Sequence, residues 1–148
     1  MTLEQLQEIF PDATADTWHQ HPNGGGWVQN TAKVAETAYV GEDALVSGNA
    51  KVFENAWVFE NARVYKNARV FGNAWVFGNA EVFGNAWVFD NARVSEDALV
   101  SGNAKVYGHA WVSMNVRVFG NARVLGNAKV LGNAKVAGDT LVSEGELT

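Results

Sequence analysis

Valine recurs at every sixth position of this chain from Val28 to Val142, twenty times without a break. Two positions before each valine, from Ala32 onward, stands a small residue, which is Ala everywhere except at Val116 and Thr140. In an extended strand, alternate side chains share a face, so the small residue and the valine point to one side and the residues flanking valine point to the other. Each six-residue unit therefore predicts one short strand with two side chains on the same face.

The residues that flank the valines indicate which of these faces is the interior. The flanking set includes the charged residues Arg63, Arg69, Glu81, Arg93 and Lys105. Charged side chains are almost never buried without a partner, and so many cannot all be paired inside a narrow core. We therefore expect Ala and Val to face inward and the flanking residues to face outward.

The two residues between successive strands are mostly Gly-Asn, Glu-Asn or Glu-Asp, which tolerate the positive φ needed at a sharp corner. Residues 41–58 recur at 95–112 with 14 of 18 positions identical, an offset of 54 residues. This offset equals three coils of 18 residues but four and a half coils of 12, so it favours three sides. The pattern predicts an all-β, three-sided parallel β-helix of about six and a half coils.

Units such as FGNAWV, FGNARV and LGNAKV resemble the bacterial hexapeptide-transferase repeat over residues 27–143. The chain departs from that repeat directly after the aliphatic position, where Gly occurs only at Gly41. It is more similar to the variant xGNAxV repeats of little-characterised hexapeptide transferases and phage-encoded β-helix proteins. The resemblance implies a left-handed parallel β-helix and assembly as a homotrimer.

Residues 1–26 do not follow the repeat, and we expect them to form an N-terminal helical cap on a repeat domain at 27–148. Thr2 and Gln5 have the spacing of a capping box. Four apolar residues share one side of the expected helix, namely Leu3, Leu6, Ile9 and Phe10. Pro11 ends the helix, and the segment HPNGGG is expected to be a flexible loop that leads into the first strand.

Composition places the chain among soluble globular domains, since 47% of its residues are hydrophobic and 18% are charged. The chain has no Cys, which excludes a disulfide and a Cys-based zinc site. No signal peptide and no run of 18 apolar residues is present, so we expect a cytoplasmic protein that does not enter the membrane. The net charge of −5 makes nucleic acid an unlikely partner.

Candidate catalytic chemistry rests on one histidine. The resemblance implies an acyltransferase that takes acetyl-CoA or another acyl-CoA, with a His as general base between subunits. His109 replaces the corner Asn in YGHAWV, and histidine is the side chain that most often acts as a general base. No inserted loop surrounds it, however, so an ordinary exposed corner residue is the favoured interpretation. His19 and His21 lack a third metal ligand nearby in sequence, and we expect no metal.

Sorting the outward positions by the 18-residue coil gathers aromatic residues on one face. These are Tyr39, Trp57, Phe59, Trp75, Phe77 and Trp111. Six buried aromatic side chains would cover roughly 900 Å² or more, which exceeds the largest apolar patch on a typical monomer. We therefore expect this face to be the interface of a homo-oligomer.

A second face combines cations with aromatic rings. Its residues are Lys51, Phe53, Arg69, Phe71, Trp87, Phe89, Lys105 and Tyr107. Such surfaces stack bases or sugar rings and contact phosphate, although a ladder that only stabilises the sheet explains the same pattern. This face is the candidate ligand-binding site.

The leading interpretation is a non-catalytic homo-oligomeric β-helix, trimeric by the resemblance, which acts as a scaffold or binding module without a cofactor. Two alternatives stay open. One is an acyltransferase with sites between subunits, and the other is a phage-encoded protein that sequesters nucleotides or glycans.

Overall fold

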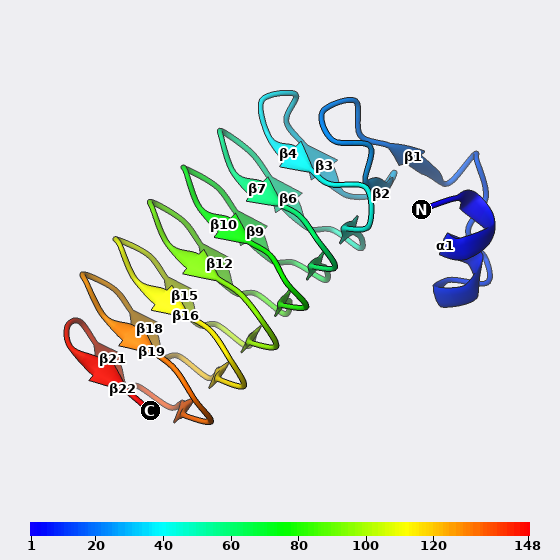
Figure 1. The fold of residues 1–148 in the computed structure, drawn as a ribbon. Helices are drawn as coiled ribbons and strands as arrows, with labels where there is room; N and C mark the ends of the chain where they lie inside the picture. The colour runs from blue at the N-terminus through cyan, green and yellow to red at the C-terminus, as the bar shows by residue number, and fades with distance from the viewer.

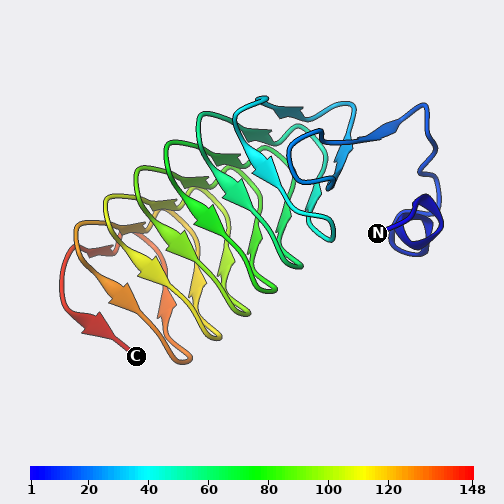
Figure 2. The ribbon, with the colours of Figure 1, turned by 45° about the horizontal axis from the view of Figure 1, so that its top comes forward.

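The computed structural model, which describes residues 1–148, is a parallel β-solenoid of about seven turns with three sheets and one short helix, α1 (Leu3–Ile9). The turns stack into a three-sided column, with α1 beside the N-terminal turns and the C-terminus at the opposite end (Figure 1). Figure 2 shows the three sides of the column more openly. The predicted three-sided all-β fold is confirmed.

Each side of the column is one sheet, here called sheet A, sheet B or sheet C. Sheet A contains β1 (Trp18–Gln20), β2 (Trp27–Gln29), β5 (Leu45–Val46), β8 (Arg63–Val64), β11 (Glu81–Val82), β14 (Leu99–Val100), β17 (Arg117–Val118) and β20 (Lys135–Val136). Sheet B contains β3 (Lys33–Val34), β6 (Lys51–Val52), β9 (Arg69–Val70), β12 (Trp87–Val88), β15 (Lys105–Val106), β18 (Arg123–Val124) and β21 (Leu141–Val142). Sheet C contains β4 (Tyr39–Val40), β7 (Trp57–Val58), β10 (Trp75–Val76), β13 (Arg93–Val94), β16 (Trp111–Val112), β19 (Lys129–Val130) and β22 (Glu146–Leu147).

The interior consists of the small residue and the valine of each unit. They form one cluster of 36 buried residues, and nearly all of them are fully buried. Strand pairing advances by 18 residues, so that Trp75 pairs with Trp57 on one side and with Arg93 on the other. The prediction that Ala and Val face inward, in coils of 18 residues, is confirmed.

The corners use positive φ at the first of their two residues. Gly48 has φ 64°, and a Cβ there would lie 2.9 Å from the Lys66 backbone nitrogen of the next coil. Lys66 itself adopts φ 59°, so the column accepts a side chain at some corners. The second corner residue donates its N–H to the following coil, as Asn61 does to the Gly78 carbonyl at 2.8 Å.

The last strand lies outside the six-residue spacing. Leu147 pairs with Val130 and takes the inward position, although it follows Val142 by only five residues. The corner after β21 is therefore one residue shorter than the others. This strand extends the predicted six and a half coils to about seven.

The N-terminal segment contains the predicted helix, and it also contains a strand, β1, that was not predicted. The capping box between Thr2 and Gln5 is present. α1 packs on the outer face of sheet A, where Leu6 joins a buried cluster with Trp27 and Leu45. The helix lies there, rather than over the open end, because these large outward side chains would otherwise meet water. With seven residues, α1 is too short to span a bilayer.

The edge of the first turn is paired on two of its three sides. β1 is antiparallel to β2 and extends sheet A. The loop before β2 extends sheet C, because the Gly26 N–H donates to the Val40 carbonyl at 2.9 Å and the Val40 N–H donates to the Asn23 carbonyl at 3.0 Å. An exposed strand edge invites pairing with other chains, and these contacts remove two such edges.

Candidate binding surfaces

The outer face of sheet C, here called the aromatic face, carries two adjacent columns of rings. Its members are Tyr39, Trp57, Phe59, Trp75, Phe77 and Trp111, and strand pairing places them in the columns expected from the sequence. The rings of Trp57 and Trp75 stack with centroids 5.4 Å apart, and those of Phe59 and Phe77 stack at 4.9 Å. Trp57 and Trp111 are each 42% exposed, so the face remains open to solvent.

Cations continue the tryptophan column where the aromatic rings are interrupted. The Arg93 guanidinium lies 4.7 Å from the Trp75 ring and 5.5 Å from the Trp111 ring. The Lys129 ammonium lies 5.0 Å from the other side of Trp111. Cation–π contacts of this kind stabilise exposed sites by about 0.5–1 kcal/mol each. The column is therefore one stacked surface and not a series of isolated rings.

The aromatic face contains two hollows. One, of about 310 Å³, is lined by Phe77, Arg93, Ser95, Glu96, Trp111 and Ser113. The other, of about 470 Å³, is lined by Tyr39, Gly41, Glu42, Asp43, Trp57, Phe59 and Glu60. Carboxylates at the corner between sheets C and A thus form the rim of both hollows.

The outer face of sheet B, here called the cationic face, brings together the predicted ligand-binding residues. They are Lys51, Phe53, Arg69, Phe71, Trp87, Phe89, Lys105 and Tyr107. Four of these rings stack in one column, with successive centroids 4.7–4.9 Å apart: Phe53, Phe71, Phe89 and Tyr107. In the neighbouring column, Arg69 and Lys105 lie on either side of Trp87, at 5.3 Å and 4.7 Å from its ring.

Charges on the solenoid are almost entirely unpaired within the chain. The one ion pair joins the terminal amine of Met1 to Asp43 at 3.4 Å. No strand residue of sheet B before β21 is acidic, so the lysines and arginines of this face have no neighbouring carboxylate in their own sheet. The strands of sheet B therefore carry cations on both sides of Trp87 and no carboxylate.

His109 lies at an exposed corner between sheets B and C. Its backbone N–H donates to the Gly126 carbonyl at 2.8 Å, as the corner asparagines do, and its ring makes no hydrogen bond. The alternative in which His109 acts as a general base toward acyl-CoA stays a prediction.

The other two histidines take part in local hydrogen bonds. The His19 Nδ1 donates to the Asn30 Oδ1 at 2.6 Å, and the buried His21 donates from Nε2 to the Ala38 carbonyl at 2.8 Å. No group of three or more His, Cys, Asp or Glu side chains gathers closely enough to hold a metal ion. Both rings thus fix the segment around β1 to the first turn.

A third group of polar residues, not expected from the sequence, lies where α1 meets sheet A. Tyr65 donates from its hydroxyl to Glu81 Oε1 at 3.0 Å. Burial, together with the charge of Glu81, raises the pKa of Tyr65 to about 12. Ser47 and Arg63 line the same hollow, which Ile9 and Phe10 close from the helix side. Nothing in the sequence marks these residues, because only the docking of α1 makes them a site.

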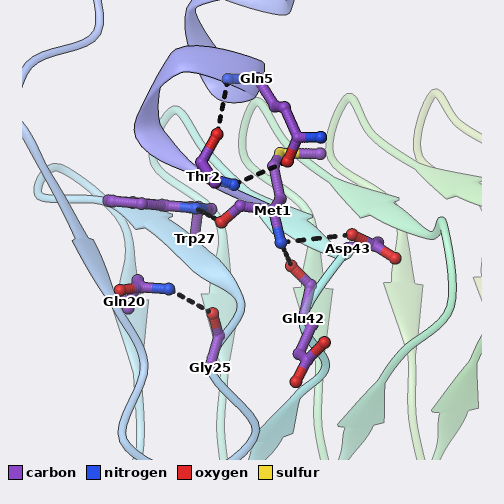
Figure 3. A network of polar contacts seen from close by, with 8 residues as sticks. All are labelled: Met1, Thr2, Gln5, Gln20, Gly25, Trp27, Glu42 and Asp43. Atoms are coloured by element: carbon purple, nitrogen blue, oxygen red, sulfur yellow. Dashed lines mark hydrogen bonds and ion pairs between the residues drawn. The ribbon is translucent and has the colours of Figure 1, made fainter.

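The start of α1 is tied to the solenoid by the contacts in Figure 3. The indole N–H of Trp27 donates to the Met1 carbonyl at 2.8 Å, and the Met1 amine lies 3.5 Å from the Glu42 carbonyl. The side chains of Thr2 and Gln5 complete the capping box beside them. These contacts hold one wall of the hollow in place.

Comparison with known proteins supports the solenoid fold and assigns no function. Residues 62–78 match the family model of the YdcK beta solenoid repeat, which is slightly less than one coil of this chain. No curated protein and no solved structure matches the chain. The chain is therefore a β-solenoid repeat protein.

Proposed function

We propose that this chain is a homo-oligomeric scaffold of the hexapeptide-repeat kind, which assembles as a trimer through the aromatic face of sheet C. The exposure of Trp57 and Trp111, 42% each, is the observation that carries the proposal. Tryptophan is enriched at the centres of interfaces, where it contributes much of the binding energy.

The outer faces of the three sheets differ in how well they could bind a second copy of the chain. At its N-terminal end, sheet A is already covered by α1. Sheet B carries a strip of cations that would repel the same strip on another copy. The aromatic face has the largest concentration of aromatic rings. Association through this face would therefore remove the largest apolar area from water.

Charges around the aromatic face also suit a second copy. Arg93 and Lys129 have no carboxylate within 4.0 Å in their own chain, and the rim residues Glu60 and Glu96 have no cation within that distance. Opposite charges on one surface can pair across an isologous or a closed cyclic contact. The resemblance to hexapeptide repeats favours the closed ring of three.

The test is the mass of the full chain in solution, by sedimentation equilibrium at several concentrations. We expect three times the 16.0 kDa of one chain. A monomer at all concentrations would overturn the proposal. A dimer would retain self-association but exclude the ring of three.

The cationic face supports a second candidate function, which is the binding of anionic ligands that contain flat rings, such as nucleotides. The observation that favours it is Trp87 between two cations, within a strip that has no carboxylate on its strands before β21. Aromatic rings beside cations bind bases and phosphates together. Calorimetric titration with ATP and AMP tests it, and Arg69→Gln should weaken any binding whereas Arg117→Gln, on sheet A, should not.

A further inference from the structure

The hollow between α1 and sheet A has the composition of a small binding site. Its volume is about 320 Å³. Ligand pockets range from about 300 to 1,000 Å³, so this one would accept a small molecule only. Ile9, Phe10 and Leu45 form an apolar wall, and Ser47, Arg63 and Glu81 provide polar groups from three successive coils of sheet A. The hollow lies on a different side of the column from both faces considered above.

Ser47 is the first sign that the hollow is built to hold a ligand. Its side chain is 7% exposed, yet its hydroxyl makes no hydrogen bond to the protein. All fully enclosed polar side-chain atoms of the chain do have a partner. The Ser47 hydroxyl is therefore not fully enclosed, and it is free to donate to a ligand in the hollow.

Arg63 and Glu81 are the second sign. They are directly opposite each other on paired strands, the arrangement in which oppositely charged side chains usually pair. Their charged groups nevertheless stay more than 4.0 Å apart. One oxygen of Glu81 accepts the Tyr65 hydroxyl, while its other oxygen and the whole Arg63 guanidinium have no partner in the chain. The hollow thus holds one free cation and one free anionic oxygen, both half-buried.

We propose that this hollow binds a free α-amino acid with an apolar side chain, whose carboxylate meets Arg63 and Ser47 and whose ammonium meets Glu81. The guanidinium and a hydroxyl are suitable donors for a carboxylate. A plain carboxylic acid would leave the charge of Glu81 uncompensated, and a plain amine would leave that of Arg63 uncompensated. Ile9, Phe10 and Leu45 contact the apolar side chain of the ligand.

The experiment is calorimetric titration of the full chain with L-phenylalanine and L-leucine, and with two analogues of phenylalanine. One analogue, 3-phenylpropionate, lacks the ammonium, and the other, 2-phenylethylamine, lacks the carboxylate. Each missing charged contact should weaken binding by at least about tenfold. The proposal is overturned if neither amino acid binds at millimolar concentration, or if either analogue binds as tightly as phenylalanine.

Variants locate the site. Arg63→Met and Ser47→Ala should each weaken binding of the tighter amino acid, whereas Arg117→Met should leave it unchanged. Arg117 is the matched control because it occupies the same outward column of sheet A three coils further on, beyond the reach of α1. Equal losses in Arg63→Met and Arg117→Met would overturn the assignment.

Glu81→Gln provides an independent check if Arg63→Met lowers stability. The amide oxygen of Gln can still accept the Tyr65 hydroxyl, so this variant should fold while it loses the ammonium contact. It should bind L-phenylalanine at least about tenfold more weakly and 3-phenylpropionate no more weakly than the unmodified chain. Unchanged affinity for phenylalanine would overturn the role of Glu81.

Discussion

Two apolar patches lie on the outside of this solenoid, and the chain covers only one of them. On sheet A, Trp27 and Leu45 are 7% and 2% exposed because α1 packs over them and Trp18 of β1 joins the same buried cluster. On sheet C, Trp57 and Trp111 hold the same outward position in their coils and are 42% exposed. Position in the repeat therefore does not determine the burial of an outward residue. Its burial depends on whether another segment packs over it, and no segment of the chain packs over the aromatic face of sheet C.

The interior is common to both patches, and breaking it has the largest expected effect. Val76→Asp places a carboxylate with no partner among fully buried Ala and Val side chains, so we expect the chain not to fold. Loss of the β signal in circular dichroism is the measurement. An unchanged spectrum and melting temperature would contradict the inward position of Val76.

Leu6→Ala tests the covered patch. Leu6 is fully buried between α1 and sheet A, and a truncation of this kind costs about 2–5 kcal/mol. Because each coil contacts mainly its neighbours, the loss should be confined to the N-terminal part of the column. Hydrogen exchange should become faster for residues 1–29 and stay slow for the central strands. Glu8→Ala, at an exposed position of the same helix, is the control.

Trp75→Glu tests the uncovered patch. Trp75 is in the middle of the aromatic face, in contact with Trp57 and Arg93, and truncation of an anchor at a packed interface costs at least about 2 kcal/mol. In a closed ring the change occurs in every copy and adds like charges near one another. We expect a smaller species in sedimentation with an unchanged β spectrum. The same mass and stability as the unmodified chain would make the cationic face the next candidate interface.

Tyr65 gives the covered region a dependence on alkaline pH. Burial and the charge of Glu81 raise the pKa of Tyr65 from its ordinary value of 10.0 to about 12 in the folded chain. The unfolded chain therefore loses this proton first, and stability falls as pH rises from about 10 to about 12. Urea unfolding at a series of pH values measures the effect. Tyr65→Phe, which has no hydroxyl to titrate, should reduce the slope, and an identical slope would contradict the shift.

The sequence predicted what repeats and the N-terminal helix, but it missed two strands that occur outside the repeat. Valine and alanine recur because every coil buries the same two positions, so the spacing revealed the strands, the corners and the 18-residue register. Leu147 was missed because its corner is one residue shorter. β1 was missed because it pairs antiparallel with β2, outside the repeat.

The candidate sites show the same division. The ring columns of sheets B and C follow from the register, and their roles as interface and ligand-binding site stay predictions. Ser47 has the outward position of an ordinary surface residue, and only the contact between α1 and sheet A buries it. Such a contact depends on side-chain packing between segments that no periodic pattern connects.

The smallest effect is expected for His109→Asn, at a corner that neither patch includes. The corner residues one coil away on each side are Asn91 and Asn127, so the change restores the residue of the column. The backbone N–H of His109 donates to the Gly126 carbonyl at 2.8 Å, and that of Asn91 donates to the Gly108 carbonyl at the same distance. Because the fold uses the main chain here and not the ring, the free energy of unfolding should change by less than about 0.5 kcal/mol. Thermal and urea unfolding measure this, and an assay of acetyl transfer from acetyl-CoA on the same samples separates stability from chemistry. If the unmodified chain transfers acetyl groups and the equally stable variant does not, His109 is a catalytic base and the non-catalytic scaffold is wrong.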